Sequence, residues 1–425
     1  MKKKCLSWIF TLSVMLVCLC LLPTKAQAAS ESDLTFKLNS DGESYSVTGC
    51  NSYARGKLTI PAIYNSKPVT NVDSWAFFDC PRLTSIIIPN SVTNIGDYAF
   101  YDCTSLTSII IPHSVTSIGS YVFTYCTSLT SITIPDSVTT IGDDAFFYCT
   151  GLTSVTIGNS VTTIGGYAFY GCDGLTSITI PDSITSIGYG AFHGCTGLTG
   201  IWVDENNTYY CSDEFGVLYN REKTKLIQAH GAILGSYVIP DSITIIEGWT
   251  FHWCTSLTSI AIPDGVTSIG EHAFYNCSSL TNITIPDSVT NIGGGAFAYC
   301  TGLTSITIPD SVTTIGYSAF YNCENLAYLL LPKGIDTIDE DAFYGCTGLK
   351  KVFHKGTQAD WDWIIIEDGN DALTNATIVH EYVGDTIVVP GDMDGDLEIT
   401  RNDVISLLLR VTMPNRFPLT KPGKI

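Results

Sequence analysis

The chain has 425 residues and a formal net charge of −20 at pH 7, from 41 acidic and 21 basic side chains. This acidity keeps a large surface soluble and argues against nucleic acid and anionic membranes as binding partners. The length suffices for several ordinary domains, and length alone does not distinguish several domains from one repetitive domain. The residue pattern does.

The first 28 residues have the organisation of a secretory signal peptide. Residues 2–4 are lysines, an apolar run covers residues 5–22, and Ala-Gln-Ala at 26–28 supplies the small residues that precede a cleavage site. We predict cleavage after Ala28 and a secreted protein, extracellular or associated with the cell surface; an uncleaved membrane anchor is the alternative. Removal of this segment leaves a net charge of −24, and no later stretch approaches a membrane span.

Residues 29–57 are polar and precede a long region, residues 58–349, in which one 23-residue unit recurs. A fixed period of this length is typical of a solenoid, in which each unit buries its apolar face only by stacking on its neighbours. We interpret residues 29–57 as the N-terminal cap that covers the first open rung. The period is marked by Cys80, Cys103, Cys126, Cys149, Cys172 and Cys195, and after a break by Cys254, Cys277, Cys300, Cys323 and Cys346.

One unit, residues 129–151, reads LTSITIPDSVTTIGDDAFFYCTG and shows how each rung is expected to fold. Apolar residues alternate with Thr and Ser over 129–134, which predicts a short strand that Pro135 ends. A second apolar pair follows, Gly142 makes a turn, and residues 143–149 predict about one helical or 3₁₀ turn. The side chains expected to face inward are Leu129, Ile132, Ile134, Val138, Ile141, Ala145, Phe146 and Cys149.

The pattern L-x-x-I-x-I-P-x-x-V-x-x-I-x-x-x-A-F-x-x-C over residues 58–349 resembles the BspA-like leucine-rich repeat family. By itself the period predicts a repeat solenoid, mostly β with short helical or 3₁₀ turns, of about eleven rungs in one elongated domain. The resemblance implies a curved solenoid of a secreted or cell-surface protein that binds other macromolecules.

Thirteen cysteines remain after cleavage, and export would normally suggest disulfides. Eleven of them share one repeat position, beside the inward Phe and the following Leu, where Cys acts as a small apolar residue. We predict free, buried thiols for this ladder, because stacked equivalents point the same way rather than at each other. Bridges between adjacent rungs are the alternative, whereas no C-x-x-C pair supports a metal site.

The period breaks after Cys195. Two apolar runs, residues 216–219 and 225–228, flank a polar loop, which predicts a β-hairpin within an insertion over residues 204–239. Such an insertion also occurs in the BspA-like family. Two interpretations stay open at this point: the insertion is a binding element, or it is a degenerate rung of the solenoid.

After residue 349 the repeat gives way to a different composition. Residues 350–383 contain several Trp and Ile side chains whose bulk is expected to cover the last rung, and they resemble the closing segment of BspA-like proteins. Residues 384–390 are interpreted as a short linker, and residues 391–425 as a separate module with a tail.

The segment from Asp392 to Asp403 has the layout of a calcium-binding loop. Ca²⁺ prefers six or more hard oxygen ligands in a tight turn, and acids fall at loop positions 1, 3, 5 and 12, with an apolar residue at position 8. Thr400 is expected to ligate directly or through water, and Glu398 through its backbone carbonyl. A plain acidic turn is the alternative. The predicted ligands are Asp392, Asp394, Asp396, Glu398, Thr400 and Asp403.

With Gly391 in front and Asp rather than Glu at position 12, this segment resembles the first half of a type I dockerin. Dockerins are the modules by which secreted enzymes attach to the cohesins of a cellulosome scaffold. The resemblance implies a cohesin partner, which Arg401 and Asn402 at loop positions 10 and 11 would help to select. Leu397 stands where Gly is usual, and no second calcium loop appears before residue 425.

Two surfaces of the predicted solenoid are candidates for contact with a partner. Outward Thr and Ser side chains form an uncharged hydroxyl array on the strands, interrupted by Trp202 and Tyr328, which we take as partner-binding candidates; the strand preference of Thr is the alternative reason for the array. Aromatic residues recur at the turn, and two interpretations stay open for them: stacking on the sugar rings of a ligand, or packing between neighbouring turns. Four of these aromatic residues share one repeat position: Tyr98, Tyr121, Tyr167 and Trp249. Trp253 and Tyr317 lie near this position in their own repeats.

No G-x-S-x-G, H-E-x-x-H or Walker-type motif is present, and the seven histidines are scattered along the sequence. These absences predict a non-catalytic protein. The two resemblances imply a recognition or adhesion protein that binds a protein partner, with a Ca²⁺-binding tail that docks it to a cellulosome scaffold. The alternative is a carbohydrate-binding protein for plant polysaccharide that uses the aromatic surface.

Overall fold

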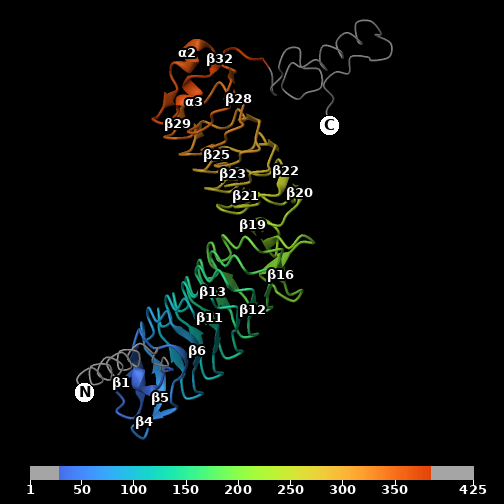
Figure 1. Ribbon diagram of the computed structural model, residues 1–425. Helices are drawn as coiled ribbons and strands as arrows, with labels where there is room; N and C mark the ends of the chain where they lie inside the picture. The colour runs from blue at the N-terminus through green and yellow to red at the C-terminus, as the bar shows by residue number, and fades with distance from the viewer. Residues whose placement is uncertain (1–27, 384–425) are drawn as a thin grey trace, which may run out of the picture. The chain divides into compact units, whose positions relative to one another are not determined.

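A computed structural model describes residues 28–383 and divides them into two compact units, each of which is a β-solenoid (Figure 1). Unit 1 contains the described residues up to Asp173 together with Ser186–Ala191, and unit 2 contains Gly174–Thr185 and the residues from Phe192 onward. The predicted repeat solenoid is confirmed, with about 15 turns in place of the eleven expected rungs. The additional turns come from the capping segments and the insertion, whose strands join the same ladders.

Unit 1 begins with the segment expected to be a cap and continues into the regular rungs. Its elements are η1 (Glu31–Asp33), β1 (Leu34–Leu38), β2 (Tyr45–Cys50), β3 (Gly56–Thr59), β4 (Ile63–Tyr64), β5 (Lys67–Val72), β6 (Leu83–Ile87), β7 (Asn94–Ile95), β8 (Ser108–Ile110), β9 (Ser117–Ile118), β10 (Ser131–Thr133), β11 (Thr140–Ile141), β12 (Ser154–Thr156), β13 (Thr163–Ile164) and β15 (Ser186–Ile187). The long sheet has the order β1-β2-β5-β7-β9-β11-β13-β15, with β4 paired to β5. The sheets β3-β6-β8 and β10-β12 form a second side of the rungs.

Unit 2 has the same construction. Its elements are β14 (Ile178–Ile180), β16 (Ile201–Val203), β17 (Tyr210–Ser212), β18 (Leu218–Asn220), β19 (Lys225–Gln228), β20 (Gly235–Val238), β21 (Ile245–Ile246), β22 (Leu257–Ala261), β23 (Ser268–Ile269), β24 (Asn282–Thr284), β25 (Asn291–Ile292), β26 (Ser305–Thr307), β27 (Thr314–Ile315), β28 (Tyr328–Leu331), β29 (Thr337–Ile338), β30 (Lys351–His354), α2 (Gln358–Trp361), β31 (Ile365–Ile366), α3 (Asp371–Thr374) and β32 (Thr377–Val379). The long sheet has the order β17-β18-β19-β21-β23-β25-β27-β29-β31, and the sheets β14-β16, β20-β22-β24 and β26-β28-β30-β32 form the second side.

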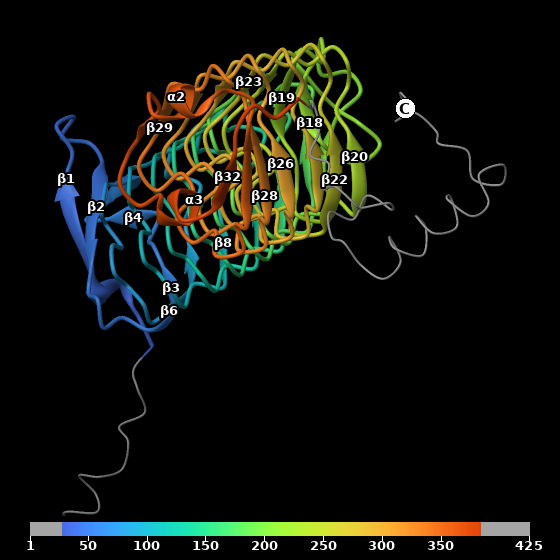
Figure 2. The same cartoon turned by 90° about the horizontal axis from the view of Figure 1, so that it is seen from above.

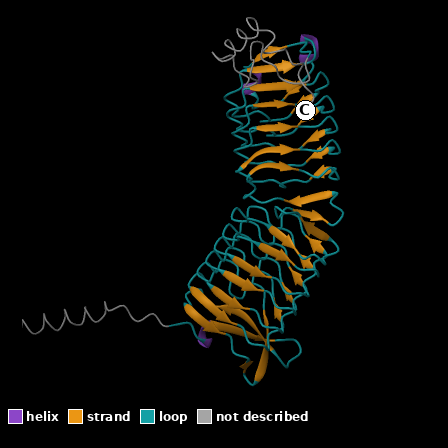
Figure 3. Cartoon of the chain, turned by 90° about the vertical axis from the view of Figure 1, so that its right-hand side faces the viewer, coloured by secondary structure: helices purple, strands orange, loops and turns teal. Residues whose placement is uncertain are grey.

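Neighbouring rungs pair in parallel with a shift of one repeat, so that each residue lies beside its own equivalent. In the pair β10–β12, Ser131 is opposite Ser154 and Thr133 is opposite Thr156. The resulting rows of short strands are seen in Figure 3, and Figure 2 shows β26, β28 and β32 in one such row, in which β30 lies between β28 and β32. This register is the reason that identical residues form continuous columns.

The insertion in unit 2 consists of paired strands. β17 pairs antiparallel with β18, and β18 pairs antiparallel with β19, so the two apolar runs of the sequence lie on neighbouring strands. β19 then pairs in parallel with β21, with Leu226 beside Ile246. Within the insertion, β19 therefore occupies the place of a rung strand in the long sheet, and β20 joins the second side by pairing in parallel with β22.

The core of each rung follows the predicted inward pattern. In the rung at residues 129–151, every side chain that was expected to face inward is at most 3% exposed, which confirms the prediction. Phe146 stacks between Phe123 and Phe169, with ring centroids 5.2 and 5.1 Å apart. In unit 2 an equivalent column runs from Phe251 to Phe343 with spacings of 5.2–5.3 Å. Such packed aromatic columns supply much of the apolar burial that holds a solenoid together.

The ladder cysteines are buried free thiols, as predicted, and in residues 28–383 all thirteen cysteines are free. The structure adds a polar contact that the sequence did not reveal. Cys149 Sγ donates to the Phe123 carbonyl at 3.0 Å, and Cys323 Sγ donates to the Phe297 carbonyl at 3.1 Å. Because the partner lies one rung earlier, each thiol contributes a weak bond along the solenoid as well as apolar bulk.

The segment after each Ile-Gly pair was expected to be a helical or 3₁₀ turn, and the structure shows a different local conformation. In one rung, overlapping four-residue turns are closed by bonds from Ala99 N to Gly96 O, Tyr101 N to Tyr98 O and Cys103 N to Phe100 O. Two residues of this segment are left-handed, with φ of 58° at Tyr98 and 60° at Asp102. A right-handed helix cannot contain such residues, so the segment is a series of β-turns.

The left-handed residues have a clear role in the stack. Tyr98 N donates to Ser120 O at 3.0 Å, and Asp102 N donates to the Thr124 carbonyl at 2.8 Å, so both N–H groups reach the next rung. The same arrangement recurs at the equivalent positions of the other rungs. The inter-rung hydrogen bonds therefore stabilise the left-handed backbone conformation, which residues other than Gly normally avoid.

Gly142 was expected to make a turn, and at its equivalents Gly96 and Gly165 the carbonyl does accept the bond that closes the first turn. The structure adds the reason why this residue is Gly. Its φ is not left-handed; instead, an added Cβ would come within 2.6–2.7 Å of the backbone of Gly119 and Ser120 in the preceding rung. Gly is required because two rungs approach each other closely at this corner.

The end of unit 2 is covered by short elements rather than by aromatic bulk alone. The helix α2 begins with a capping box in which Thr357 and Asp360 bond reciprocally, and Trp361 at its end packs partly against the core. Ile364 is 9% exposed, whereas Trp363 is 85% exposed and points away from the core. The prediction that the tryptophans cover the last rung thus fits Trp361 and is wrong for Trp363.

Candidate functional site

The predicted calcium ligands and the residues predicted to select a cohesin lie outside residues 28–383, so both assignments stay predictions. These residues are Asp392, Asp394, Asp396, Glu398, Thr400 and Asp403, with Arg401 and Asn402. Within residues 28–383 no group of three or more His, Cys, Asp or Glu side chains could hold a metal ion. In the same range, no helix is both long enough and apolar enough to cross a membrane.

The two contact points predicted on the strand face lie in different sheets of unit 2. Trp202 is in β16, opposite Thr179 of β14, and is 41% exposed; its indole lies over Gly200, where an added Cβ would come within 2.6 Å of the ring. Tyr328 is in β28, opposite Ser305 of β26, and is half-buried. The structure exposes Trp202 but does not bring the two residues into one sheet.

The hydroxyl array on the strands is in part used within the fold. In unit 1, Thr107 Oγ1 donates to the Thr84 carbonyl and Thr153 Oγ1 donates to the Thr130 carbonyl, each at 2.9 Å. Equivalent bonds recur in unit 2. These hydroxyls link one rung to the next, which favours the structural interpretation of the array over a contact surface.

Large aromatic side chains gather on the turn side of unit 1, and this surface is the strongest candidate site. They occupy a few repeat positions around the buried Phe of each turn, so the 23-residue register brings them together in space. The sequence singled out Tyr98, Tyr121 and Tyr167 and missed the rest, although the same spacing marks most of them. This aromatic turn face comprises Trp75, Phe78, Tyr98, Tyr101, Tyr121, Tyr125, Phe147, Tyr148, Tyr167, Tyr170 and Tyr189.

At its N-terminal end the aromatic turn face is a closed stack. The rings of Trp75 and Tyr98 are 3.9 Å apart and 5° from parallel, and those of Tyr98 and Tyr121 are 4.5 Å apart and 4° from parallel. Each ring covers the face of its neighbour, whereas a sugar that stacks on an aromatic residue needs an open ring face. This part of the surface therefore fits packing between turns better than carbohydrate binding.

Further along, the rings are more open. Tyr101 and Tyr125 meet edge to face at 88°, and Tyr167 and Tyr189 at 86°. Tyr125, Tyr148, Tyr167 and Tyr189 are between 36% and 51% exposed. Edge-to-face packing leaves one face of a ring accessible, and Tyr125 and Tyr148 stack only loosely, with centroids 5.8 Å apart and planes at 20°. This part of the aromatic turn face therefore presents both ring surface and phenol groups to solvent.

Carboxylates lie among these rings. Partial burial raises the pKa of Asp102, with Asp79 as a further cause, and burial also raises the pKa of Asp144. The charge of the Asp144 carboxylate is the largest cause of a raised pKa at Tyr121. At neutral pH the surface therefore combines protonated phenols with negative charge.

The histidines of the sequence are less scattered in space than along the chain. In unit 2, His193, His252 and His272 surround Trp249, with ring centroids 5.8, 4.7 and 4.4 Å from the indole. Burial lowers the pKa of His193 to about 4 and that of His252 to about 3, and it also lowers the pKa of His272. All three rings are neutral at pH 7.

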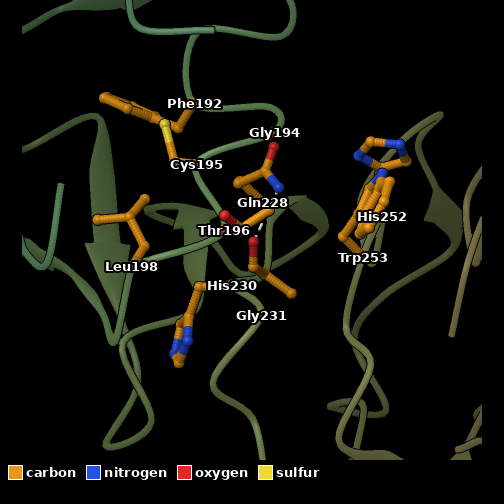
Figure 4. Close-up of a pocket in the computed structure, with 11 residues that line it drawn as sticks. Phe192, Gly194, Cys195, Thr196, Leu198, Gln228, His230, Gly231, His252 and Trp253 are labelled. Carbon is orange, nitrogen blue, oxygen red and sulfur yellow. Dashed lines mark hydrogen bonds between the residues drawn. The ribbon is translucent and has the colours of Figure 1, made fainter. Parts of the chain in front are cut away.

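A small hollow lies beside this cluster, where the insertion returns to the regular rungs. Figure 4 shows Phe192, Cys195 and Leu198 on one side of it and His252 and Trp253 on the other. The space available to the centre of a water molecule is about 10 Å³, which is enough for about one water. Pockets for small-molecule ligands are far larger, so this hollow fits a buried water rather than a substrate.

The sequence profile described as "BspA type Leucine rich repeat region (6 copies)" matches the chain over residues 48–173, 116–228 and 229–350. These matches span more than half of the chain and coincide with the stacked rungs. No curated protein sequence matches the chain.

Several solved structures share the fold. A leucine rich cell surface protein from Faecalibacterium prausnitzii A2-165 is 32% identical, with a TM-score of 0.69, and the match covers 80% of this chain and 97% of that protein. A leucine-rich repeat protein from Eubacterium ventriosum is 26% identical, with a TM-score of 0.56 and coverage of 77% and 84%. The pneumococcal vaccine antigen PcpA is 22% identical, with a TM-score of 0.70 and coverage of 84% and 99%, which is a likeness of fold alone.

Proposed function

The chain belongs to the BspA-type leucine-rich repeat family, and from this we propose that it is a non-catalytic recognition or adhesion protein that binds macromolecular partners through its solenoid surface. The observation that carries the proposal is the aromatic turn face of unit 1. Aromatic residues, above all Tyr and Trp, are enriched at protein–protein interfaces because they offer large contact areas at a small cost in conformational entropy.

The first experiment asks what class of partner the full-length protein retains. Immobilised protein is incubated with intact cells, with protease-treated cells, and with a series of plant polysaccharides on affinity gels. We expect cell binding that protease treatment abolishes. Retention on polysaccharide alone, with no protease-sensitive binding to cells, would instead establish the carbohydrate-binding alternative.

We also propose an extracellular or cell-surface location. The support is the leader-like sequence of residues 1–28 and the cell-surface protein of Faecalibacterium prausnitzii at 32% identity. Expression with the native leader in a Gram-positive host should release a chain whose first residue is Ala29 on N-terminal sequencing. An intact leader in the membrane fraction would contradict this proposal and point to an anchor.

For the tail we propose a Ca²⁺ loop and, through it, docking to a cohesin. The support is the spacing of acids at loop positions 1, 3, 5 and 12, which suits the oxygen preference of Ca²⁺. Titration calorimetry with CaCl₂ should show binding heat that Asp392→Ala removes, while Asp368→Ala, an acid outside the loop, leaves it unchanged. Absence of heat in the unmodified protein would show that the segment is a plain acidic turn.

A further inference from the structure

The basic residues of the chain avoid the regular rungs. Residues 83–220 contain neither Lys nor Arg; the last basic residue before this stretch is Arg82 and the next is Arg221. Arg82 lies over the ring of Tyr53, so it is engaged at the start of the solenoid. The rungs that display most of the aromatic turn face therefore carry negative charge without a cation of their own.

The carboxylates of this surface belong to the same turns as the rings. They are Asp79, Asp97, Asp102, Asp143 and Asp144. Asp97 and Asp143 are exposed, and neither Asp102 nor Asp144 has a basic residue among the causes of its altered pKa. Carboxylates that lie among aromatic rings and have no neighbouring Lys or Arg make this surface electrostatically complementary to a cationic partner.

Two of these acids are held in place by the fold. Asp97 Oδ1 accepts a bond from Ser120 N at 2.8 Å, and Asp143 Oδ1 accepts one from Gly166 N at 2.7 Å. In each case a backbone N–H of the next rung fixes one carboxylate oxygen, while the side chain stays exposed. Such preorganised groups lose little freedom when a ligand binds, which favours affinity.

From this arrangement we infer that the aromatic turn face of unit 1 docks a basic polypeptide segment, whose Arg and Lys side chains pair with Asp97 and Asp143 and lie against the open rings of Tyr125, Tyr148 and Tyr167. Guanidinium groups combine bidentate pairing to carboxylates with stacking on aromatic rings, so one Arg uses both features of the surface. The inference rests on the proposed function and adds the surface and the partner class.

The charge contribution is tested with a fluorescein-labelled oligo-arginine peptide and the full chain, by fluorescence anisotropy. Asp97→Asn/Asp143→Asn should weaken binding about tenfold, because two charge pairs are lost while Asn keeps the acceptor for the backbone N–H. The matched control is Asp136→Asn/Asp264→Asn, which changes the net charge equally. Like Asp97 and Asp143, Asp136 accepts a hydrogen bond from a backbone N–H of the next rung, that of Asn159. It differs from them in its place, which is the corner between β10 and β11.

The aromatic contribution is tested with Tyr148→Gly/Tyr167→Gly. Both tyrosines are left-handed, with φ of 53°, and the next rung has left-handed glycines at the same positions, Gly171 and Gly190. The substitution therefore removes two rings without backbone strain, and the melting temperature should stay within about 5 °C of the original. Peptide affinity should fall about tenfold.

The outcomes separate the inference from the proposed function. Equal loss in the Asp136→Asn/Asp264→Asn control would overturn the inference by showing that the peptide senses only net charge. No loss in either turn-face variant would overturn it by showing that the peptide binds elsewhere. Failure to bind the peptide, alongside protease-sensitive binding to cells, would overturn the inference and leave the proposed function standing. Binding to neutral polysaccharide that depends on the tyrosines and not on the aspartates would overturn both.

Discussion

At the scale of the residue, the left-handed backbone of the turn and the exposure of its aromatic rings depend on the same residues. Tyr121 and Tyr125 are left-handed so that their N–H groups reach Asp143 O and Phe147 O of the next rung, each at 2.9 Å. The same conformation directs their rings to the turn side, where they join the aromatic turn face. The hydrogen-bond ladder and the proposed contact surface thus depend on the same residues, and Gly is a tolerated substitute only for the ladder.

The close approach of rungs at the Ile-Gly corner gives a prediction for Gly142→Ala. An added Cβ would lie 2.6 Å from the Gly119 backbone, which cannot move aside without disturbing the neighbouring rung. We expect urea denaturation to show a loss of about 1–3 kcal/mol in the free energy of unfolding. The control is Gly334→Ala, where no atom lies within 4 Å of the added Cβ and the change should be near zero. Equal stability of the two variants would show that the corner relaxes freely.

At the scale of the element, the turns of unit 2 differ from those of unit 1 by the histidines around Trp249. His252 occupies the repeat position that holds Tyr275 and Tyr321 in later rungs. Its Nδ1 is buried without a hydrogen-bond partner in the part of the chain that the structure describes. Where later rungs have a phenol ring, this position has an imidazole, which is a group that acid can protonate inside a packed turn.

This difference predicts acid sensitivity of unit 2. Burial lowers the pKa of His252 from 6.5 to about 3, so its neutral form stabilises the fold above pH 6.5 and that stability is lost as the pH falls. His252→Tyr, which installs the residue of neighbouring rungs, should reduce the loss of stability between neutral pH and about pH 4 by on the order of 2 kcal/mol. The measurement is the urea midpoint at both pH values. Parallel losses in both proteins would show that other groups cause the acid effect.

At the scale of the whole molecule, the ladders repeat one small contact many times. Buried thiols bond to carbonyls of the preceding rung in both units, and burial raises the pKa of most of them above the ordinary value of 9.0. Burial raises the pKa of Cys300 to about 12. Each unit therefore behaves as a sum of equivalent rungs whose titration effects add.

The repeated thiols predict a cooperative alkaline destabilisation. Where burial raises the pKa of a thiol in the folded state, as at Cys126 and Cys149, the stabilising contribution of that thiol is complete below about pH 9 and is lost as the pH rises beyond it. The measurement is the urea midpoint at neutral pH and at about pH 10. Cys126→Ala/Cys149→Ala, which should cost about 1 kcal/mol per site at neutral pH, should show a smaller alkaline loss than the original protein. An unchanged loss would assign the effect to tyrosines or lysines.

Much of the fold could be predicted from the sequence because its information is periodic. The inward residues from Leu129 to Cys149 and the free thiol ladder follow from which side chains are apolar, and neighbouring copies leave only one way to stack them. The site was predicted only in part. Tyr98, Tyr121 and Tyr167 were identified by their shared position. Trp75 has the same position one repeat earlier and was missed, whereas Tyr189 lies on the same surface one residue away from that position.

The sequence by itself determined the repeat solenoid and its core columns, because hydrophobic periodicity acts locally and recurs in every rung. The family followed from the resemblance of the repeated motif, which the family profile matches. Only the tertiary structure decided the details that depend on contact between rungs. It showed left-handed turns where a helical turn was expected, a Gly kept for close approach, and histidines gathered around Trp249. Stacking places residues that are 23 apart in direct contact, so the chemistry of the surface is set by neighbours that are distant along the chain.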